Sequence, residues 1–253
     1  SMNQLNQKNL TQQRGDLYPL THPQKRVWYL EKLYPDTSLY NIGGISKATC
    51  LLDLELLEEA LNLFIQRHDG LRLRFCELNG EARQYIGAYQ KVKLDFIDFS
   101  SAKDPELELN KWATAEMRKA FKLIDSSLYY FCIFKLNNQH SGFLGKFHHL
   151  IADGWSINIL CAQVYEFYEK LLKGEPIEDD AEYSYLEYLK QEQKYLNSER
   201  CIKNRAFWME KFQELPEPIF NDNIASIAGN RITYLLDKDI SFKIKEFVTQ
   251  NKT

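Results

Sequence analysis

The stretch Phe147-His148-His149-Leu150-Ile151-Ala152-Asp153-Gly154-Trp155-Ser156 is the centre of the expected fold, because it joins two segments of clear pattern. Gly142 to Phe147 is an apolar, strand-like run, and residues 157–172 repeat apolar side chains with helical spacing. The two histidines therefore stand where a strand ends, and the Asp-Gly pair stands in the turn before a helix. Such a junction holds polar side chains rigidly and leaves one face open, as a catalytic base requires.

Length and composition narrow the class of protein. The chain has 253 residues, enough for one large domain or two small ones, and its formal net charge of −3 gives no electrostatic footprint for nucleic acid. No apolar run approaches the ~20 residues that span a bilayer, and Ser1 to Gln13 lack a signal-peptide core. The five cysteines form no C-x-x-C pair, which predicts reduced thiols. We therefore expect a cytoplasmic protein without nucleic-acid or membrane partners.

The segments before the central stretch have local signals of their own. Thr21 is an expected helix N-cap, with Pro23 in the first turn. The expected apolar stripe of that helix consists of Val27, Leu30 and Leu33 or Tyr34. Asp53 is expected to cap a second helix that ends at Gly70. A hairpin follows, with an alternating strand Leu71 to Cys76, an Asn79-Gly80 turn and a returning strand Ala82 to Ile86.

Further elements complete a mixed pattern. Expected strands are Val92 to Phe99, Leu128 to Leu136, Ser141 to His148 and Arg231 to Leu236. Expected helices are Pro105 to Phe121, the helix that ends at Gly174, Tyr183 to Asn197 and Cys201 to Leu215. Because antiparallel hairpins occur among alternating strands and helices, the pattern favours a mixed α/β sandwich over a doubly wound sheet.

Three stretches resemble motifs of one family, the condensation domains of nonribosomal peptide synthetases. Residues 147–156 resemble its His-His-x-x-x-Asp-Gly core motif. Thr21-x-Pro23-Gln24-x-Arg26-x-Trp28-x-Leu30 resembles the first motif, Ser-x-Ala-Gln-x-Arg-Leu-Trp-x-Leu, with Thr, Pro and Val as departures. The segment 67–75, Arg-His-Asp-Gly-Leu-Arg-Leu-Arg-Phe, resembles the second, Arg-His-Glu-x-Leu-Arg-Thr-x-Phe. Tyr185-x-Glu187-Tyr188 is a more distant echo of the fourth, Tyr-x-Asp-Phe/Tyr.

The resemblance implies an α/β fold like that of chloramphenicol acetyltransferase, with a mixed sheet, flanking helices and two lobes around a tunnel. Residues 1–16 are expected to be a flexible tail and residues 17–180 the N-terminal lobe. Residues 181–253 are expected to be a helical crossover and the truncated start of the C-terminal lobe. Because the later motifs of the family are missing, we expect this segment alone to have little or no activity.

The resemblance also implies a reaction and its partners. An amine on one carrier protein attacks a thioester on another, so the partners would be upstream and downstream peptidyl carrier proteins and an adjacent adenylation domain. The substrates would ride on phosphopantetheine arms, with no cofactor bound directly. Imidazole titrates near neutral pH, and His149 is therefore expected to be the base or the residue that positions the amine. The sequence leaves these two roles open.

The neighbours of His149 have weaker expectations. Adjacent strand residues point to opposite faces, so His148 is expected to be structural. Asp153 could orient the imidazole as in a catalytic triad, but the resemblance implies an ion pair with an arginine that shapes the loop. Arg67 is the favoured partner over Arg72 and Arg74. Gly154 would allow a close backbone approach or merely a turn, Trp155 would line the substrate or the core, and Ser156 would contact substrate or cap a helix.

Several alternatives accompany this assignment. An epimerisation domain shares the His-His motif, and a carrier-docking or recruitment module of the same fold would need no catalysis. A coenzyme A acyltransferase need not carry the first two motifs. Three N/O ligands could suit Zn²⁺ or Fe²⁺, but adjacent strand histidines diverge, so no metal is expected. The chain has no Gly-rich phosphate loop and no Gly-x-Ser-x-Gly elbow.

Overall fold

A computed structural model describes residues 14–48, 50–152, 157–178, 185, 194 and 230–235. The strands are β1 (Tyr18–Pro19), β2 (Asn41–Ala48), β3 (Leu73–Leu78), β4 (Glu81–Ile86), β5 (Asp95–Asp98), β6 (Tyr129–Lys135), β7 (Ser141–His148) and β8 (Asn230–Leu235). The α-helices are α2 (His22–Leu33), α3 (Leu54–Arg67), α4 (Pro105–Met117) and α5 (Ile157–Lys173). Two 3₁₀ turns are η1 (Asp69–Arg72) and η2 (His149–Ile151).

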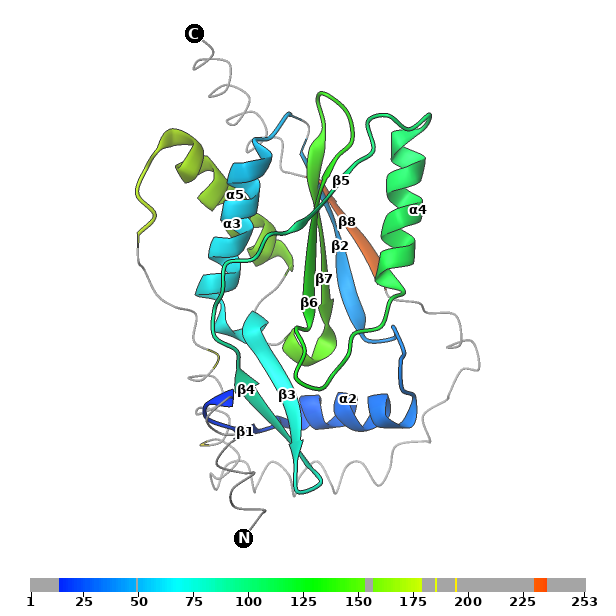
Figure 1. The fold of residues 1–253 in the computed structure, drawn as a ribbon, viewed down its shortest axis with the longest axis vertical. Coiled ribbons are helices and arrows are strands. Elements are labelled where there is room, and N and C mark those ends of the chain that lie inside the picture. The colour runs from blue at the N-terminus through cyan, green and yellow to red at the C-terminus, as the bar shows by residue number, and fades with distance from the viewer. Residues whose placement is uncertain are drawn as a thin grey trace, which may run out of the picture.

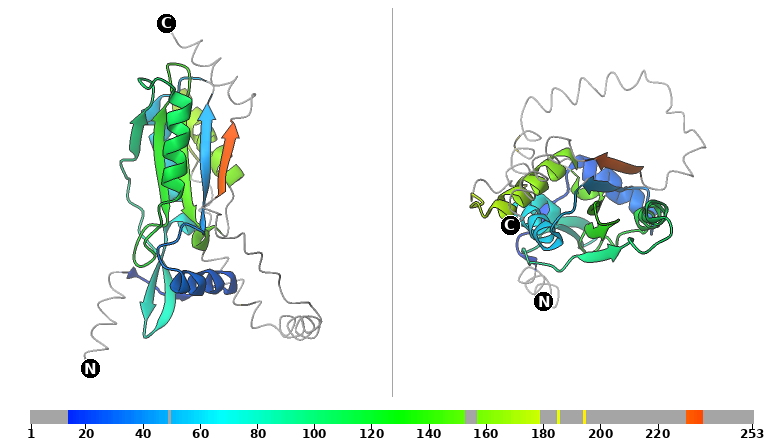
Figure 2. Two further views of the ribbon diagram at one scale, coloured as in Figure 1. Left: turned by 90° about the vertical axis from the view of Figure 1, so that its right-hand side faces the viewer. Right: turned by 90° about the horizontal axis from the view of Figure 1, so that it is seen from above.

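A five-stranded sheet of order β5-β6-β7-β2-β8 forms the centre of the fold. β7 pairs antiparallel with β6 and β2, whereas β5–β6 and β2–β8 are parallel, so the predicted mixed sheet and the β6–β7 hairpin are confirmed. Helices α3 and α5 lie on one side of the sheet and α4 on the other (Figures 1 and 2). A smaller sheet, β1-β4-β3, projects beyond one end of the large sheet, next to α2 (Figure 1).

Two apolar cores cover the two faces of the large sheet. Side chains alternate along β7, so Phe143 and Phe147 join the core beneath α3 and α5, and Leu144 joins the core beneath α4. Every residue of β7 is buried, as expected of a strand at the centre of a sheet covered on both faces. The strand that leads to the two histidines is therefore buried on both faces and paired along both edges.

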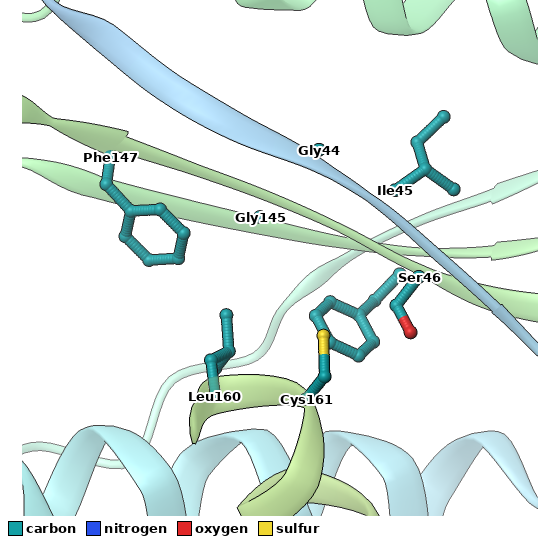
Figure 3. A pocket seen from close by; sticks show the side chains of 8 residues that line it. Gly44, Ile45, Ser46, Gly145, Phe147, Leu160 and Cys161 are labelled. Carbon is teal, nitrogen blue, oxygen red and sulfur yellow. The ribbon is translucent and has the colours of Figure 1, made fainter. Parts of the chain in front are cut away.

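Glycines let β2 and β7 approach closely. A Cβ on Gly43 would lie 2.1 Å from the carbonyl oxygen of Gly145 on the neighbouring strand, too close for any side chain. On the face toward α5, Gly44 and Gly145 border a cavity of about 10 Å³ together with Leu160 and Cys161 (Figure 3). That space holds about one water molecule, so it is a packing defect and not a substrate site.

The predicted helix caps and turns are confirmed, but α3 ends at Arg67 and α4 at Met117, before the predicted ends at Gly70 and Phe121. Thr21 accepts from the Gln24 amide in a capping box, and Asp53 accepts from the first amides of α3. Asn79 and Gly80 both have positive φ, as a type I′ turn between β3 and β4 requires. Gly174, with φ of 66°, follows the end of α5.

Two predicted strand starts are wrong. The strand predicted from Leu71 begins at Leu73, because residues 69–72 form η1 directly after α3. The strand predicted from Val92 begins at Asp95. The backbone N–H and carbonyl of Val92 bond to the side chain of Asn62 on α3 and therefore do not join a sheet ladder.

The predictions for the C-terminal part fall only partly on described residues. Strand β8 matches the predicted strand Arg231 to Leu236 within one residue at each end. Of the predicted helix 183–197, residues 185 and 194 are described and both are helical. The remainder of that helix, and the helix predicted at 201–215, lie outside the described residues. The expected lobe boundaries stay a prediction.

Candidate active site

The two adjacent histidines lie in opposite environments. His148 is the last residue of β7 and is 1% exposed, whereas His149 is the first residue of η2 and its side chain is exposed. The sequence predicted that their side chains diverge because strand neighbours alternate. The structure separates them at the junction itself, since His149 has already left the strand. A ring that reaches solvent from the end of a buried strand can meet a substrate.

The backbone around His149 is fixed at four points. The His149 N–H donates to the carbonyl of Tyr40 at 2.9 Å, and the His149 carbonyl accepts from Ala152 at 3.1 Å. The Leu150 N–H donates to His148 Nδ1 at 3.0 Å, and the Leu150 carbonyl accepts from Gln24 Nε2 at 3.0 Å. An exposed side chain on a backbone fixed in this way has a defined origin, which positioning of a reactant requires.

Helix α2 lies directly under this turn (Figure 1) and supplies two buried polar side chains. Gln24 Nε2 donates to Gln84 and Leu150 and contacts the Tyr185 hydroxyl at 3.0 Å. Glu31 Oε1 lies 2.6 Å from His148 Nε2, and both side chains are buried. Neither Gln24 nor Glu31 was assigned a role in the site from the sequence.

The predicted apolar stripe of α2 is wrong. The buried residues of the helix are Gln24, Val27, Trp28 and Glu31, while Leu33 and Tyr34 are 71% and 67% exposed. Only Val27 was placed correctly, because the inward face has polar residues at its two ends. A polar residue spaced three or four positions from buried apolar neighbours was the signal that could have revealed Gln24 and Glu31.

The second motif packs beside the first. Trp28 stacks on Phe75 of β3, with ring centroids 6.0 Å apart. His68 is buried, with its ring Nε2 2.6 Å from Gln163 Oε1 on α5, and burial lowers the pKa of His68 despite this hydrogen bond. Asp69 accepts from the backbone N–H of Tyr185 at 2.7 Å. Residues of the first, second and fourth motif-like segments are thus brought together around Tyr185.

The predicted Asp153–Arg67 pair stays a prediction, because Asp153, Gly154, Trp155 and Ser156 lie outside the described residues. Arg67 is the last residue of α3, with its guanidinium 5.4 Å from the ring centroid of Phe167. Arg72 donates to the carbonyls of residues 65, 66 and 87, so it closes the end of α3. Arg72 belongs to η1 and therefore does not lie in the strand that was predicted from Leu71.

A second buried polar cluster lies two residues before His148. The Lys146 ammonium lies 3.2 Å from Glu116 Oε1 and donates to the carbonyls of residues 116 and 119 at the end of α4. Burial lowers the pKa of Lys146, although the charge of Glu116 opposes that shift. Burial also acts to raise the pKa of Glu116, but its bonds to Lys119 and Lys146 outweigh this and lower it. Asn41 donates to two carbonyls of the same helix end.

The described part of the chain contains neither a metal-binding cluster nor a membrane-spanning helix. Among those residues, no three His, Cys, Asp or Glu side chains are grouped closely enough to hold a metal ion. None of the helices in that part combines the length and the apolar character needed to cross a membrane.

Comparison with known proteins connects this geometry to a family. The family described as "Condensation domain" matches residues 14–253. Surfactin synthase subunit 1 of Bacillus subtilis (strain 168) is 34% identical over 226 residues, which are 88% of this chain and 6% of that protein. A linear gramicidin synthase of Brevibacillus parabrevis is 34% identical over 196 residues, 76% of this chain and 4% of that protein. The chain therefore spans a small part of these relatives.

Solved structures show the same fold. The starter condensation domain of rhizomide synthetase superposes with a TM-score of 0.74 at 25% identity, covering 81% of this chain and 50% of that one. The first condensation domain of the CDA synthetase gives a TM-score of 0.68 at 25% identity, covering 81% and 52%. The family resemblance and the chloramphenicol acetyltransferase-like fold predicted from the motifs are thus confirmed. The chain belongs to the condensation-domain family of nonribosomal peptide synthetases.

Proposed function

We propose that this chain supplies the His-His side of an active site that joins two carrier-bound thioesters into an amide. The substrates are aminoacyl or peptidyl groups on the phosphopantetheine arms of an upstream and a downstream carrier protein, and an adenylation domain loads one of these carriers. This proposal follows from membership of the family, whose relatives are named as synthases of surfactin and linear gramicidin.

The chemistry asks for alignment and one proton transfer. The amine nitrogen of the acceptor attacks the thioester carbonyl carbon, the new C–N bond forms, and the C–S bond breaks. His149 accepts or shares the proton that the nitrogen loses, and the departing thiolate takes up one proton. Because a thioester is already reactive, no covalent enzyme intermediate is needed, and most of the acceleration comes from holding the reactants together.

One observation supports His149 as the reacting side chain. Its ring is exposed while its backbone is bonded on both sides, whereas the neighbouring His148 is buried and bonded through both ring nitrogens. Of the two imidazoles, only that of His149 has a free path to a substrate in the described part of the chain.

The other predicted site residues keep their proposed roles. Asp153 pairs with Arg67 and shapes the loop, and Gly154 lets the backbone approach the reacting carbonyl closely. Trp155 and Ser156 contact the substrate. These roles rest on the positions of the residues within the family motif.

The test is His149→Ala in the full-length protein with both carriers loaded. We expect the rate of amide formation, followed by mass spectrometry of the acceptor carrier, to fall about 10²- to 10⁴-fold. His140→Ala is the matched control, because His140 lies at the other end of the β6–β7 hairpin and its ring bonds to the nearby Asn137 side chain. Amide formation at the wild-type rate in His149→Ala would contradict the proposal and favour a docking role.

A further inference from the structure

We infer that Glu31 is a positioning residue for the proposed reaction, acting on His149 through the ring of His148 and the amide of Leu150. The inference rests on the proposed function of His149. It adds a residue outside the His-His stretch, on a helix more than a hundred positions earlier in the chain.

The contact between Glu31 and His148 fixes where the imidazole proton lies. Glu31 Oε1 is 2.6 Å from His148 Nε2, and a carboxylate oxygen only accepts, so Nε2 carries a proton. His148 Nδ1 accepts from the Leu150 N–H at 3.0 Å, so Nδ1 carries none. The ring is therefore the neutral tautomer with its proton on Nε2, and both of its nitrogens are engaged.

Burial makes this arrangement obligatory. The relative exposure of Glu31 is 5% and that of His148 is 1%. A buried carboxylate without a donor is costly, and His148 is the donor that the described part of the chain provides for it. Without Glu31 the proton is free to move to Nδ1, and the Leu150 N–H then faces a donor and loses its partner. A buried amide without an acceptor is unfavourable, so the turn shifts to find it another partner.

Loss of the Leu150 hydrogen bond affects His149, because His149 lies between His148 and Leu150 in the chain. His148 is held by Glu31 on one side of it, and the amide of Leu150 is held on the other. Aromatic rings confine the His148 imidazole further, with the centroids of Tyr40 and Phe121 at 6.2 and 6.3 Å. The Tyr40 carbonyl also accepts from the His149 N–H. Glu31 thus controls the backbone from which the exposed ring projects, without touching the substrate.

The experiment compares Glu31→Ala and Glu31→Gln in the full-length protein with loaded carriers. Glu31→Ala removes the acceptor, and we expect kcat for amide formation to fall about 10- to 100-fold while KM for the carrier substrates changes less than about twofold. Glu31→Gln retains an oxygen that accepts from Nε2, so it should recover most of kcat. Glu58→Ala is the control for lost stability. Glu58 lies on α3, away from the turn, and its carboxylate binds the Lys93 ammonium and accepts from the Leu94 backbone N–H.

Each outcome decides the inference. Wild-type kcat in folded Glu31→Ala would overturn it. An equal loss in Glu58→Ala, or a loss in Glu31→Gln as large as in Glu31→Ala, would also overturn it, because general destabilisation or lost charge would then explain the effect. If Glu31→Ala does not fold, the ratio of kcat in Glu31→Gln to that in Glu31→Asp decides. We expect a ratio well above one, and equal values would reject the role.

The same series separates this inference from the proposed function. If His149→Ala forms product at the wild-type rate, the proposed function itself fails. If His149→Ala is inactive and Glu31→Ala is active, only the role of Glu31 is rejected.

Discussion

Two buried polar clusters lie on the same face of β7, two residues apart, and they form hydrogen bonds to different parts of the protein. Lys146 and Glu116 bond to each other, and Lys146 also binds carbonyls at the end of α4. His148 and Glu31 also bond to each other, but the second nitrogen of His148 leads on to the turn that carries the exposed His149. Burial of an ionisable group therefore does not mark a functional site. What indicates a functional site is a hydrogen-bond connection from the buried group to an exposed reactive side chain.

The greatest loss of stability should come from breaking the first cluster. Lys146→Met leaves the Glu116 carboxylate buried with only Lys119, and the carbonyls of residues 116 and 119 each lose one of their donors. We expect a loss of about 3 kcal/mol in the free energy of unfolding, measured by urea titration of the chain. In the full-length protein, kcat measured where the variant is folded should stay at the wild-type value.

The double variant Lys146→Met, Glu116→Leu tests that reasoning. Because neither buried charge remains, it should recover part of the lost stability. A clear fall in kcat for folded Lys146→Met would erase the contrast between the two clusters.

Substitution of Gln24 should cost less stability than Lys146→Met, but it should also reduce activity. Gln24→Met removes the acceptor of the capping box and the donor to the Leu150 carbonyl, so we expect about 2 kcal/mol less stability. Because Leu150 anchors the turn beside His149, kcat should fall about 10-fold. Gln84→Met removes a partner of Gln24 that does not touch the turn, and it should keep kcat. Equal kcat values in the two variants would contradict a role of α2 in positioning.

A still smaller change concerns pH and the buried His68. Burial lowers the pKa of His68 in the folded protein, so the unfolded chain binds this proton more tightly. The stability contributed by neutral His68 is complete above about pH 6.5 and is lost as the pH falls toward the lower folded-state value. When the pH is lowered from about 7.5 to 5.5, the free energy of unfolding of His68→Gln should fall by about 1 kcal/mol less than that of the wild type, as measured by urea titration. Parallel losses would show that His68 does not titrate in this range.

The sequence predicted the elements whose patterns are local. The β6–β7 hairpin, the caps at Thr21 and Asp53, and the Asn79-Gly80 turn follow from short-range chemistry that tertiary contacts did not change. The two histidines could be placed at a strand end for the same reason. Hence the fold class and the centre of the candidate site were available before any coordinates.

The sequence could not predict features that depend on distant partners. Leu33 at the end of α2 and Tyr34 just after it are exposed. Gln24 and Glu31 instead occupy the inward face of the helix, where they find hydrogen-bond partners more than fifty residues away. Val92 is not part of the predicted strand, because its backbone N–H and carbonyl form hydrogen bonds with the Asn62 side chain. Local sequence patterns predict burial from the polarity of each residue. A polar residue is buried, however, when the fold places a hydrogen-bond partner beside it, and that partner can be distant in the sequence.

Selective chemical modification compares the two adjacent histidines in a single experiment. The full-length protein is treated with limiting diethyl pyrocarbonate, peptide mass spectrometry measures the modification of each histidine, and amide formation is assayed in parallel. We predict that His149 reacts rapidly, that activity falls in step with its modification, and that His148 stays unmodified until the protein unfolds. Equal reaction rates for the two rings, or full activity after complete modification of His149, would refute the assignment of His149 as the reacting side chain.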